Sequence, residues 1–377
     1  MSRITYERGI SYDQDRQLYY LYMDLGKDED GHRVRKYGTY PSLSAARRAR
    51  DQFLIQKAKD ELIIPVELTL DDWLEEWIRE VIIPNRAETT VYGYRSIIQN
   101  HISPALGSIP LQALSPKDIQ HYYAEMMRRK GLSPNTVRRH HDLLSAALHA
   151  AMRQDLILRC PTDRVEAPHA IYKETRYYTA DTLKKLYQLV EGHPLELVVH
   201  LAGSLGLRRE EICGLKWDSV DFQLRKIHIR AARTAAGSKI IDKETKNRSS
   251  TRVLHMGDDI YHLLRRERLR QNKLKLIRGQ HWMGSNYVAL DRRCHPLAPN
   301  HLTRIFSEFI RDNGLPPLTL HGLRHTFATV ASAQGVPLFD IGKALGHSTP
   351  NTTGKIYTHL ADQLHTDAIT RVAAALK

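Results

Sequence analysis

Five short stretches in the second half of the 377-residue chain carry side chains suited to chemistry on a negatively charged substrate. Between them they offer arginine, lysine, histidine and tyrosine. The stretches are GLRREEICGLKW (206–217), ETKNRSSTR (244–252), LHGLRHTFA (320–328), LGHS (345–348) and KIYTHL (355–360). This set of side chains predicts phosphoryl transfer without a metal ion.

Each residue type meets one need of a phosphodiester under attack. Negative charge spreads over the non-bridging oxygens, and a guanidinium group can hold such oxygens with two parallel hydrogen bonds. Histidine moves protons near neutral pH, and a tyrosine hydroxyl can act as a covalent nucleophile. A lysine whose pKa is lowered by desolvation and nearby cations can protonate the leaving alkoxide. The chain has no GxxxxGK[ST] stretch, so no ATP site is expected.

The order and spacing of these stretches resemble those of the tyrosine recombinases, the integrase family of phages and conjugative transposons. The matching motifs are Gly-Leu-Arg with a following Glu at 206–211, Thr-Lys at 245–246, His-x-Leu-Arg-His at 321–325, Leu-Gly-His-Ser at 345–348, Thr-Thr at 352–353 and Tyr-Thr-His at 357–359. Ten residues lead from His347 to Tyr357, which also fits the family. The resemblance therefore implies a site-specific DNA recombinase.

The resemblance implies a phosphate clamp made of two arginines and two histidines. Arg208 and Arg324 would hold the scissile phosphate. His321 and His347 would assist proton transfer and hold phosphate oxygens. Glu211, in the first motif, is expected to be structural and to bond the backbone where a helix starts.

Two further residues would break and make bonds. Tyr357 would be the nucleophile and would leave a 3′-phosphotyrosyl link. Lys246 would be the general acid for the 5′-hydroxyl, although Lys239 and Lys243 lie in the same expected loop. Because the protein–DNA ester keeps the bond energy, the resemblance implies no metal, no ATP and no other cofactor.

Each residue taken alone has a plainer interpretation. Arg208 could be an ordinary surface charge, and Tyr357 is one of 18 tyrosines. His321 and His325 are four residues apart and could mimic a zinc pair, but no HExxH glutamate or cysteine cluster accompanies them. The joint occurrence of all the motifs in one order favours the catalytic interpretation.

The elements that must position these residues fall into three expected domains, mainly helical with small sheets. Residues 1–64 are expected to form an arm-type DNA-binding domain, a three-stranded sheet plus a helix, by the same resemblance. Residues 65–160 show helical spacing of apolar side chains, with Thr69 and two Ser-Pro pairs as helix starts, and predict a core-type DNA-binding bundle. Residues 161–170 are expected to be a linker. Residues 171–377 predict a mixed α+β catalytic domain with a C-terminal helix.

Composition agrees with a nucleic-acid partner. The net charge is +14 and the pI about 9.6, with 42% hydrophobic and 26% charged residues, which argues against disordered and collagen-like chains. No run of 18 apolar residues suggests a membrane span, and no signal peptide is apparent. Three widely spaced cysteines predict neither disulfides nor a zinc module. A bacterial cytoplasm, in association with the nucleoid, is the expected location.

The expected partner is double-stranded DNA at recombination sites. The basic residues expected to touch it are Arg33, Arg35, Arg128, Arg129, Lys130, Arg138 and Arg139, with solvated helix ends and strand edges as the alternative interpretation. A homotetramer on DNA, with an excisionase or DNA-bending factor as a further partner, follows from the resemblance. The rival functions are strand relaxation of the type IB topoisomerase kind and DNA binding without catalysis.

Overall fold

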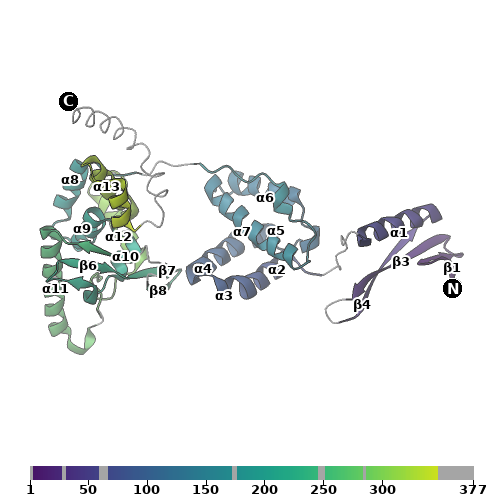
Figure 1. Cartoon of the computed structure of the whole chain (residues 1–377), viewed down its shortest axis with the longest axis horizontal. Coiled ribbons are helices and arrows are strands. Elements are labelled where there is room, and N and C mark those ends of the chain that lie inside the picture. The colour runs from purple at the N-terminus through teal and green to yellow at the C-terminus, as the bar shows by residue number, and fades with distance from the viewer. Residues whose placement is uncertain are drawn as a thin grey trace, which may run out of the picture. The chain divides into compact units, whose positions relative to one another are not determined.

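The structure is a computed structural model that describes residues 3–27, 31–58, 67–171, 176–244, 251–282 and 286–346. The chain divides into two compact units, residues 1–172 and 173–377 (Figure 1). Lys246, His347 and Tyr357 lie outside the described residues, as does the expected C-terminal helix. None of the described helices combines the length and apolar character that a membrane crossing needs.

The N-terminal part of the first unit is an antiparallel sheet with one helix against it. The sheet has the order β1 (Arg3–Glu7), β2 (Ile10–Asp13), β3 (Leu18–Lys27), β4 (Arg33–Tyr40), and α1 spans Leu43–Ala58. The expected three-stranded sheet was therefore wrong by one strand. The additional strand is β1. The chain reverses between β1 and β2 at Gly9, whose φ of +85° is a conformation that favours glycine.

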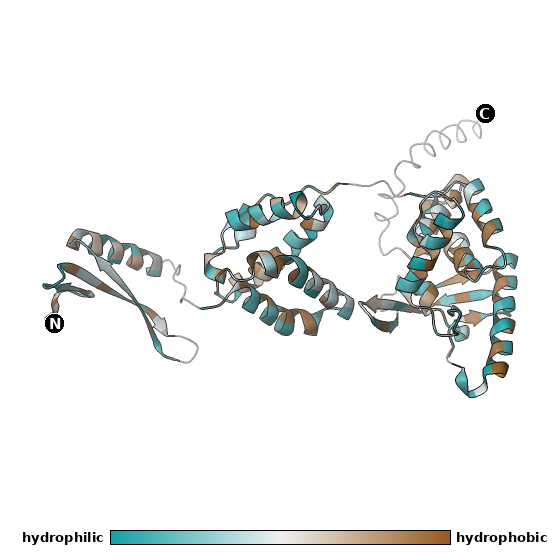
Figure 2. Ribbon diagram, turned by 180° about the vertical axis from the view of Figure 1, so that it is seen from behind, coloured by the Kyte–Doolittle hydropathy of each residue, from teal (hydrophilic) through white to brown (hydrophobic). Residues whose placement is uncertain are grey.

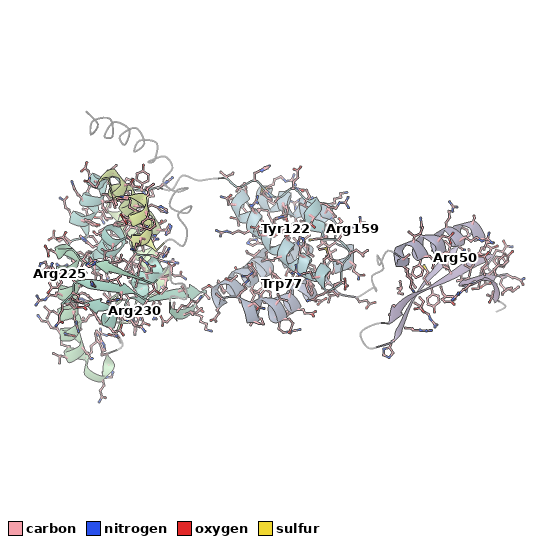
Figure 3. All side chains as sticks on the ribbon, viewed as in Figure 1. Arg50, Trp77, Tyr122, Arg159, Arg225 and Arg230 are labelled. Atoms are coloured by element: carbon pink, nitrogen blue, oxygen red, sulfur yellow. The ribbon has the colours of Figure 1, made fainter. Side chains whose placement is uncertain are left out.

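The rest of the first unit is an all-helical bundle with its own core. Its α-helices are α2 (Leu70–Trp77), α3 (Ile83–Asn85), α4 (Glu88–Ile97), α5 (Ser103–Leu106), α6 (Pro116–Arg128) and α7 (Pro134–Arg153). Trp73, Tyr122 and Leu144 are among the fully buried side chains, and Trp77 and Tyr122 are labelled among these helices in Figure 3. The side chains of Thr69, Ser115 and Ser133 accept the capping hydrogen bonds that the sequence predicted.

Two π-helical turns, Ile78–Ile82 and Ile98–Ile102, interrupt the first long helices of the bundle. Each lies just before a proline, Pro84 or Pro104. A proline lacks the N–H that an α-helix needs, and its ring crowds the preceding turn. The wider turns let the chain continue, so α2 with α3, and likewise α4 with α5, form one continuous helical segment.

The second unit contains small sheets and the helices around them. Its helices are α8 (Ala180–Val190), α9 (Glu196–Leu205), α10 (Arg209–Gly214), α11 (Asp258–Arg278), α12 (Pro299–Asp312), α13 (Leu320–Ala333) and α14 (Leu338–Leu345). One sheet has the order β5 (Val220–Asp221), β6 (Lys226–Ile229), β9 (Arg252–His255), and the other pairs β7 (Ala231–Ala236) with β8 (Lys239–Glu244). The core joins Leu186, Val199, Ile212, Leu264, Phe306 and Leu323 from six different helices. Figure 2 shows hydrophobic and hydrophilic segments alternating along single helices, as amphipathic packing requires.

The β7–β8 pair corrects one sequence expectation. We expected Lys239 and Lys243 to lie in a loop, but this segment forms a hairpin in which β8 pairs with β7. The turn needs only Gly237 and Ser238, because Gly237 has a φ of +63°. Lys239 and Lys243 therefore lie on a strand, and Lys246 follows it by two residues.

Candidate active site

The end of helix α14 is the point at which both predicted clamp arginines meet. Arg324 Nη2 donates to the carbonyl oxygen of Leu345 at 2.5 Å, and Arg208 Nη2 donates to that of Gly346 at 3.2 Å. The last carbonyls of a helix lack partners within the helix and form the negative end of its dipole. Two positive side chains from different elements are thus gathered at one place.

Arg208 is placed by a sharp change of direction between α9 and α10. Gly206 ends α9 in the left-handed conformation, with φ at +66°. A Cβ on Gly206 would lie 2.5 Å from Leu345 Cδ2 and 2.9 Å from Phe327 Cδ1. Only glycine satisfies both the backbone conformation and this close packing, and Arg208 follows as the N-cap of α10.

Arg324 lies on α13 and is 2% exposed. Its Nη1 donates to the Gly206 carbonyl at 2.7 Å, so it ties α13 to the turn that carries Arg208. Thr319 is the N-cap of this helix, and its side chain accepts the Gly322 N–H at 3.1 Å. A buried guanidinium held by carbonyl groups keeps its charge in a fixed direction, which suits it to bind a phosphate oxygen.

His321 lies one helical turn before Arg324 and is exposed. It borders a hollow that is also lined by Arg176 and Arg311. Partial desolvation lowers the pKa of His321, and the charges of Arg324 and Arg208 lower it further because they oppose a second cation. The neutral imidazole can accept a proton at neutral pH.

Its neighbour His325 has a different environment. The two rings meet edge to face with centroids 4.7 Å apart, and His325 is 7% exposed. Burial fits a packing role for His325 rather than direct contact with a substrate.

Glu211 has the structural role that we expected from sequence. Its Oε2 accepts the backbone N–H of Arg208 at 2.8 Å, and its Oε1 accepts Arg208 Nη1 at 2.8 Å. Burial acts to raise the pKa of Glu211, but hydrogen bonds and charge from Arg252, together with Arg208, outweigh it and hold the pKa below its usual value. The carboxylate therefore stays ionised and orients the Arg208 side chain.

Arg252 is the residue of this region that the sequence did not single out. Its guanidinium donates to both Glu211 oxygens at 2.9 Å and to the Ala344 carbonyl at 2.6 Å. The motif 244–252 ended on this arginine, but nothing in the sequence placed β9 beside α10 and α14.

The seven basic residues predicted to contact DNA are all exposed. Arg128 ends α6, Arg129 pairs with Glu125 at 3.0 Å, and Lys130 follows. Arg138 and Arg139 lie on α7, where Arg138 donates to the Pro168 carbonyl at 3.3 Å.

Arg33 and Arg35 alternate along β4 on the sheet face opposite α1, because the core residues Leu21 and Met23 take the other face. Tyr37 and its cross-strand partner Tyr22 lie on the same outer face and are 69% and 50% exposed. Two exposed aromatic rings beside two arginines form a surface suited to nucleic acid, and the tyrosines were not picked out from sequence.

His149, Cys160 and Asp163 come close enough together to resemble metal ligands. However, His149 Nδ1 lies 2.8 Å from the Ser145 carbonyl, and its Nε2 lies 3.2 Å from Asp163 Oδ1. Both ring nitrogens thus have protein partners, and the group ties the 3₁₀ turn at Pro161–Arg164 to α7.

Comparison with known families agrees with the geometry. Residues 176–364 match the phage integrase family, and residues 69–127 match the N-terminal SAM-like domain of phage integrases. Among curated relatives, a tyrosine recombinase XerC-like protein of Caldanaerobacter subterraneus is 25% identical over 375 residues, covering 94% of this chain and 95% of the relative. The ICEBs1 integrase of Bacillus subtilis is 25% identical, covering 70% and 72%.

Solved structures share the fold. The Tn1549 transposon integrase in complex with transposon right end DNA aligns with a TM-score of 0.68 at 21% identity, covering 81% of this chain and all of that one. A lambda integrase tetramer bound to a Holliday junction gives 0.59 at 20% identity, covering 94% and 96%. The matched domains show that this chain belongs to the phage integrase family, with a tyrosine recombinase catalytic domain that carries out site-specific DNA recombination.

Proposed function

We propose that this integrase cuts and rejoins DNA through a covalent link between Tyr357 and a 3′ phosphate. The Tyr357 hydroxyl oxygen attacks phosphorus, and the bond from phosphorus to the 5′ oxygen breaks. His321 accepts the tyrosine proton, and Lys246 gives a proton to the 5′ oxygen. The 5′-hydroxyl of a partner strand then reverses the attack and releases the tyrosine.

The convergence of Arg208 and Arg324 at α14 is the observation that carries this proposal. Two guanidiniums directed to one place can neutralise the charge that grows on the non-bridging oxygens during the attack. His347 follows Gly346 directly in the chain, and we assign it the fourth place in the clamp. No step requires a metal ion or ATP.

A covalent adduct is the direct test. The full-length protein is incubated in EDTA with a nicked duplex that carries the core sequence it selects from a random library, and the products are run on a denaturing gel. We expect an adduct at a 3′ phosphate, no adduct with Tyr357→Phe, and a normal adduct with Tyr92→Phe, an exposed control. An adduct in Tyr357→Phe would overturn the assignment, and relaxation of supercoils without a defined site would favour the topoisomerase alternative.

We also propose that three regions share DNA binding, with boundaries at residues 1–64, 65–160 and 171–377 and a linker at 161–170. Arg33 and Arg35 belong to the first, with Tyr22 and Tyr37 beside them. Replacing both arginines by alanine should weaken binding to a separate arm-type sequence while leaving core binding unchanged. Equal loss at both sequences would argue against a separate arm-binding region.

The bundle is expected to contact the core sequence mainly through phosphates. The residues proposed for this are Arg128, Arg129, Lys130, Arg138 and Arg139. Removing one phosphate contact should reduce the slope of log affinity against log salt concentration by about one, without changing which sequence is preferred. A variant that changes sequence preference would instead be reading bases.

Four copies on a synapsed pair of sites complete the proposed assembly, since a lambda integrase tetramer is known on a Holliday junction. Native mass spectrometry of the protein with a junction of its own sites should give four chains per junction. We further propose that an excisionase or bending factor joins this complex, and that the complex forms on bacterial DNA in the cytoplasm.

A further inference from the structure

Arg252 at the start of β9 is a buried arginine to which the proposed chemistry gives no task. It is 9% exposed, although arginine is normally a surface residue. Its guanidinium makes three hydrogen bonds, two with Glu211 and one with the Ala344 carbonyl. The ion pair that it forms with Glu211 is not required by the fold alone, because apolar residues of similar volume can often replace both members of a buried pair without loss of stability.

The first contact connects Arg252 to the clamp. Glu211 accepts hydrogen bonds from the two Arg252 nitrogens on one side and from Arg208 on the other. The carboxylate is 3% exposed, so water does not replace a missing donor. Without Arg252, Glu211 would be held by Arg208 alone and both side chains would be free to shift.

The second contact connects Arg252 to the helix end. Arg252, Arg324 and Arg208 donate to three successive carbonyls, those of Ala344, Leu345 and Gly346. Arg252 is the member of this trio with no expected contact to DNA. It therefore fixes α14 relative to α10 whether or not a phosphate is bound.

We propose that Arg252 is a positioning residue for strand cleavage, which acts through Glu211 on Arg208 and through Ala344 on the end of α14. The inference rests on the proposed clamp roles of Arg208 and Arg324. A shift of about 1 Å in a group that holds a reacting phosphate can cost about 100-fold in rate. The loss should appear in the cleavage step rather than in DNA affinity.

A charge-neutral substrate separates positioning from folding. Arg252→Met and Arg252→Lys are prepared as full-length proteins, and cleavage is timed on two nicked duplexes. One carries the normal phosphodiester and the other a methylphosphonate at the scissile position, which removes the charge that the clamp must neutralise. We expect Arg252→Met to be slower by about 100-fold on the phosphodiester, and by less than about threefold on the methylphosphonate. Arg252→Lys should fall between Arg252→Met and the wild type.

The matched control is Arg266→Met. Arg266 also donates to a buried carboxylate, Glu196, but at the opposite end of α9. It should lose thermal stability without a selective loss on the phosphodiester.

The possible outcomes distinguish a failure of the Arg252 proposal from a failure of the proposed nucleophile, Tyr357. Equal slowing of Arg252→Met on both substrates would show a structural role only and would overturn the proposal. An unchanged rate on the phosphodiester would overturn it as well. If the wild type forms no adduct on either substrate, or Tyr357→Phe still does, the proposed nucleophile fails before Arg252 is in question.

Discussion

Replacing Glu211 by glutamine should destabilise the catalytic unit strongly, because four N–H groups share this one carboxylate. Glutamine keeps one acceptor oxygen and puts an NH₂ group where the other oxygen was. Two of the four donors, at least one of them a guanidinium nitrogen, would then face a donor; they lie at 2.8 to 2.9 Å in the wild type. At about 1.5–3 kcal/mol for each hydrogen bond to a charged group, the loss is about 3–6 kcal/mol. Measured losses for breaking a buried ion pair, about 3–5 kcal/mol, fall in the same range.

The double variant Glu211→Gln with Arg252→Met tests the physical reason for this loss. Removing both charges leaves fewer unpaired groups, so the double variant should be at least about 2 kcal/mol more stable than the sum of the single losses predicts. Hydrogen exchange in rising urea, followed by mass spectrometry, reads the unfolding free energy of peptides from 176–346 separately from those of the helical bundle. Additive losses, or a loss below about 1 kcal/mol for Glu211→Gln, would refute the reasoning.

Three further predictions use other parts of the two units. Burial lowers the pKa of His140 to about 4, so below pH 6.5 the unfolded chain binds a proton that the folded chain does not bind. Bundle stability should therefore fall by roughly 3 kcal/mol between pH 6.5 and pH 4, and His140→Gln should flatten this pH profile in calorimetry. The lowered pKa of His321 keeps its imidazole neutral somewhat below pH 6.5, so adduct formation should decline only at more acidic pH, and His321→Gln should remove that decline. A Cβ on Gly214 would lie 2.8 Å from the backbone of Ala232, so Gly214→Ala should lower the thermal unfolding temperature, whereas Gly93→Ala, in open space within α4, should not.

Sequence predicted the helices well where a cap and an apolar stripe occurred together. Thr69 and Ser115 each lie three residues before an aspartate, and both capping boxes form. Local hydrogen bonds of this kind involve near neighbours in the chain, so they can be read without knowing the fold. Strands were harder, because β8 pairs with β7 through a two-residue turn that the pattern of side chains did not mark.

The site divides in the same way. The types of the arginine, histidine and tyrosine residues were enough to predict phosphoryl transfer, because residue type limits which chemistry a side chain can do, and the family resemblance of their motifs narrowed this to a recombinase. The meeting of Arg208, Arg252 and Arg324 at three successive carbonyls was not predictable, since their elements lie up to 116 residues apart in the chain. Sequence determined which groups were available for catalysis. Only tertiary packing decided that a buried carboxylate and the end of a helix would hold three like charges together, because neutralising them requires partners from distant segments.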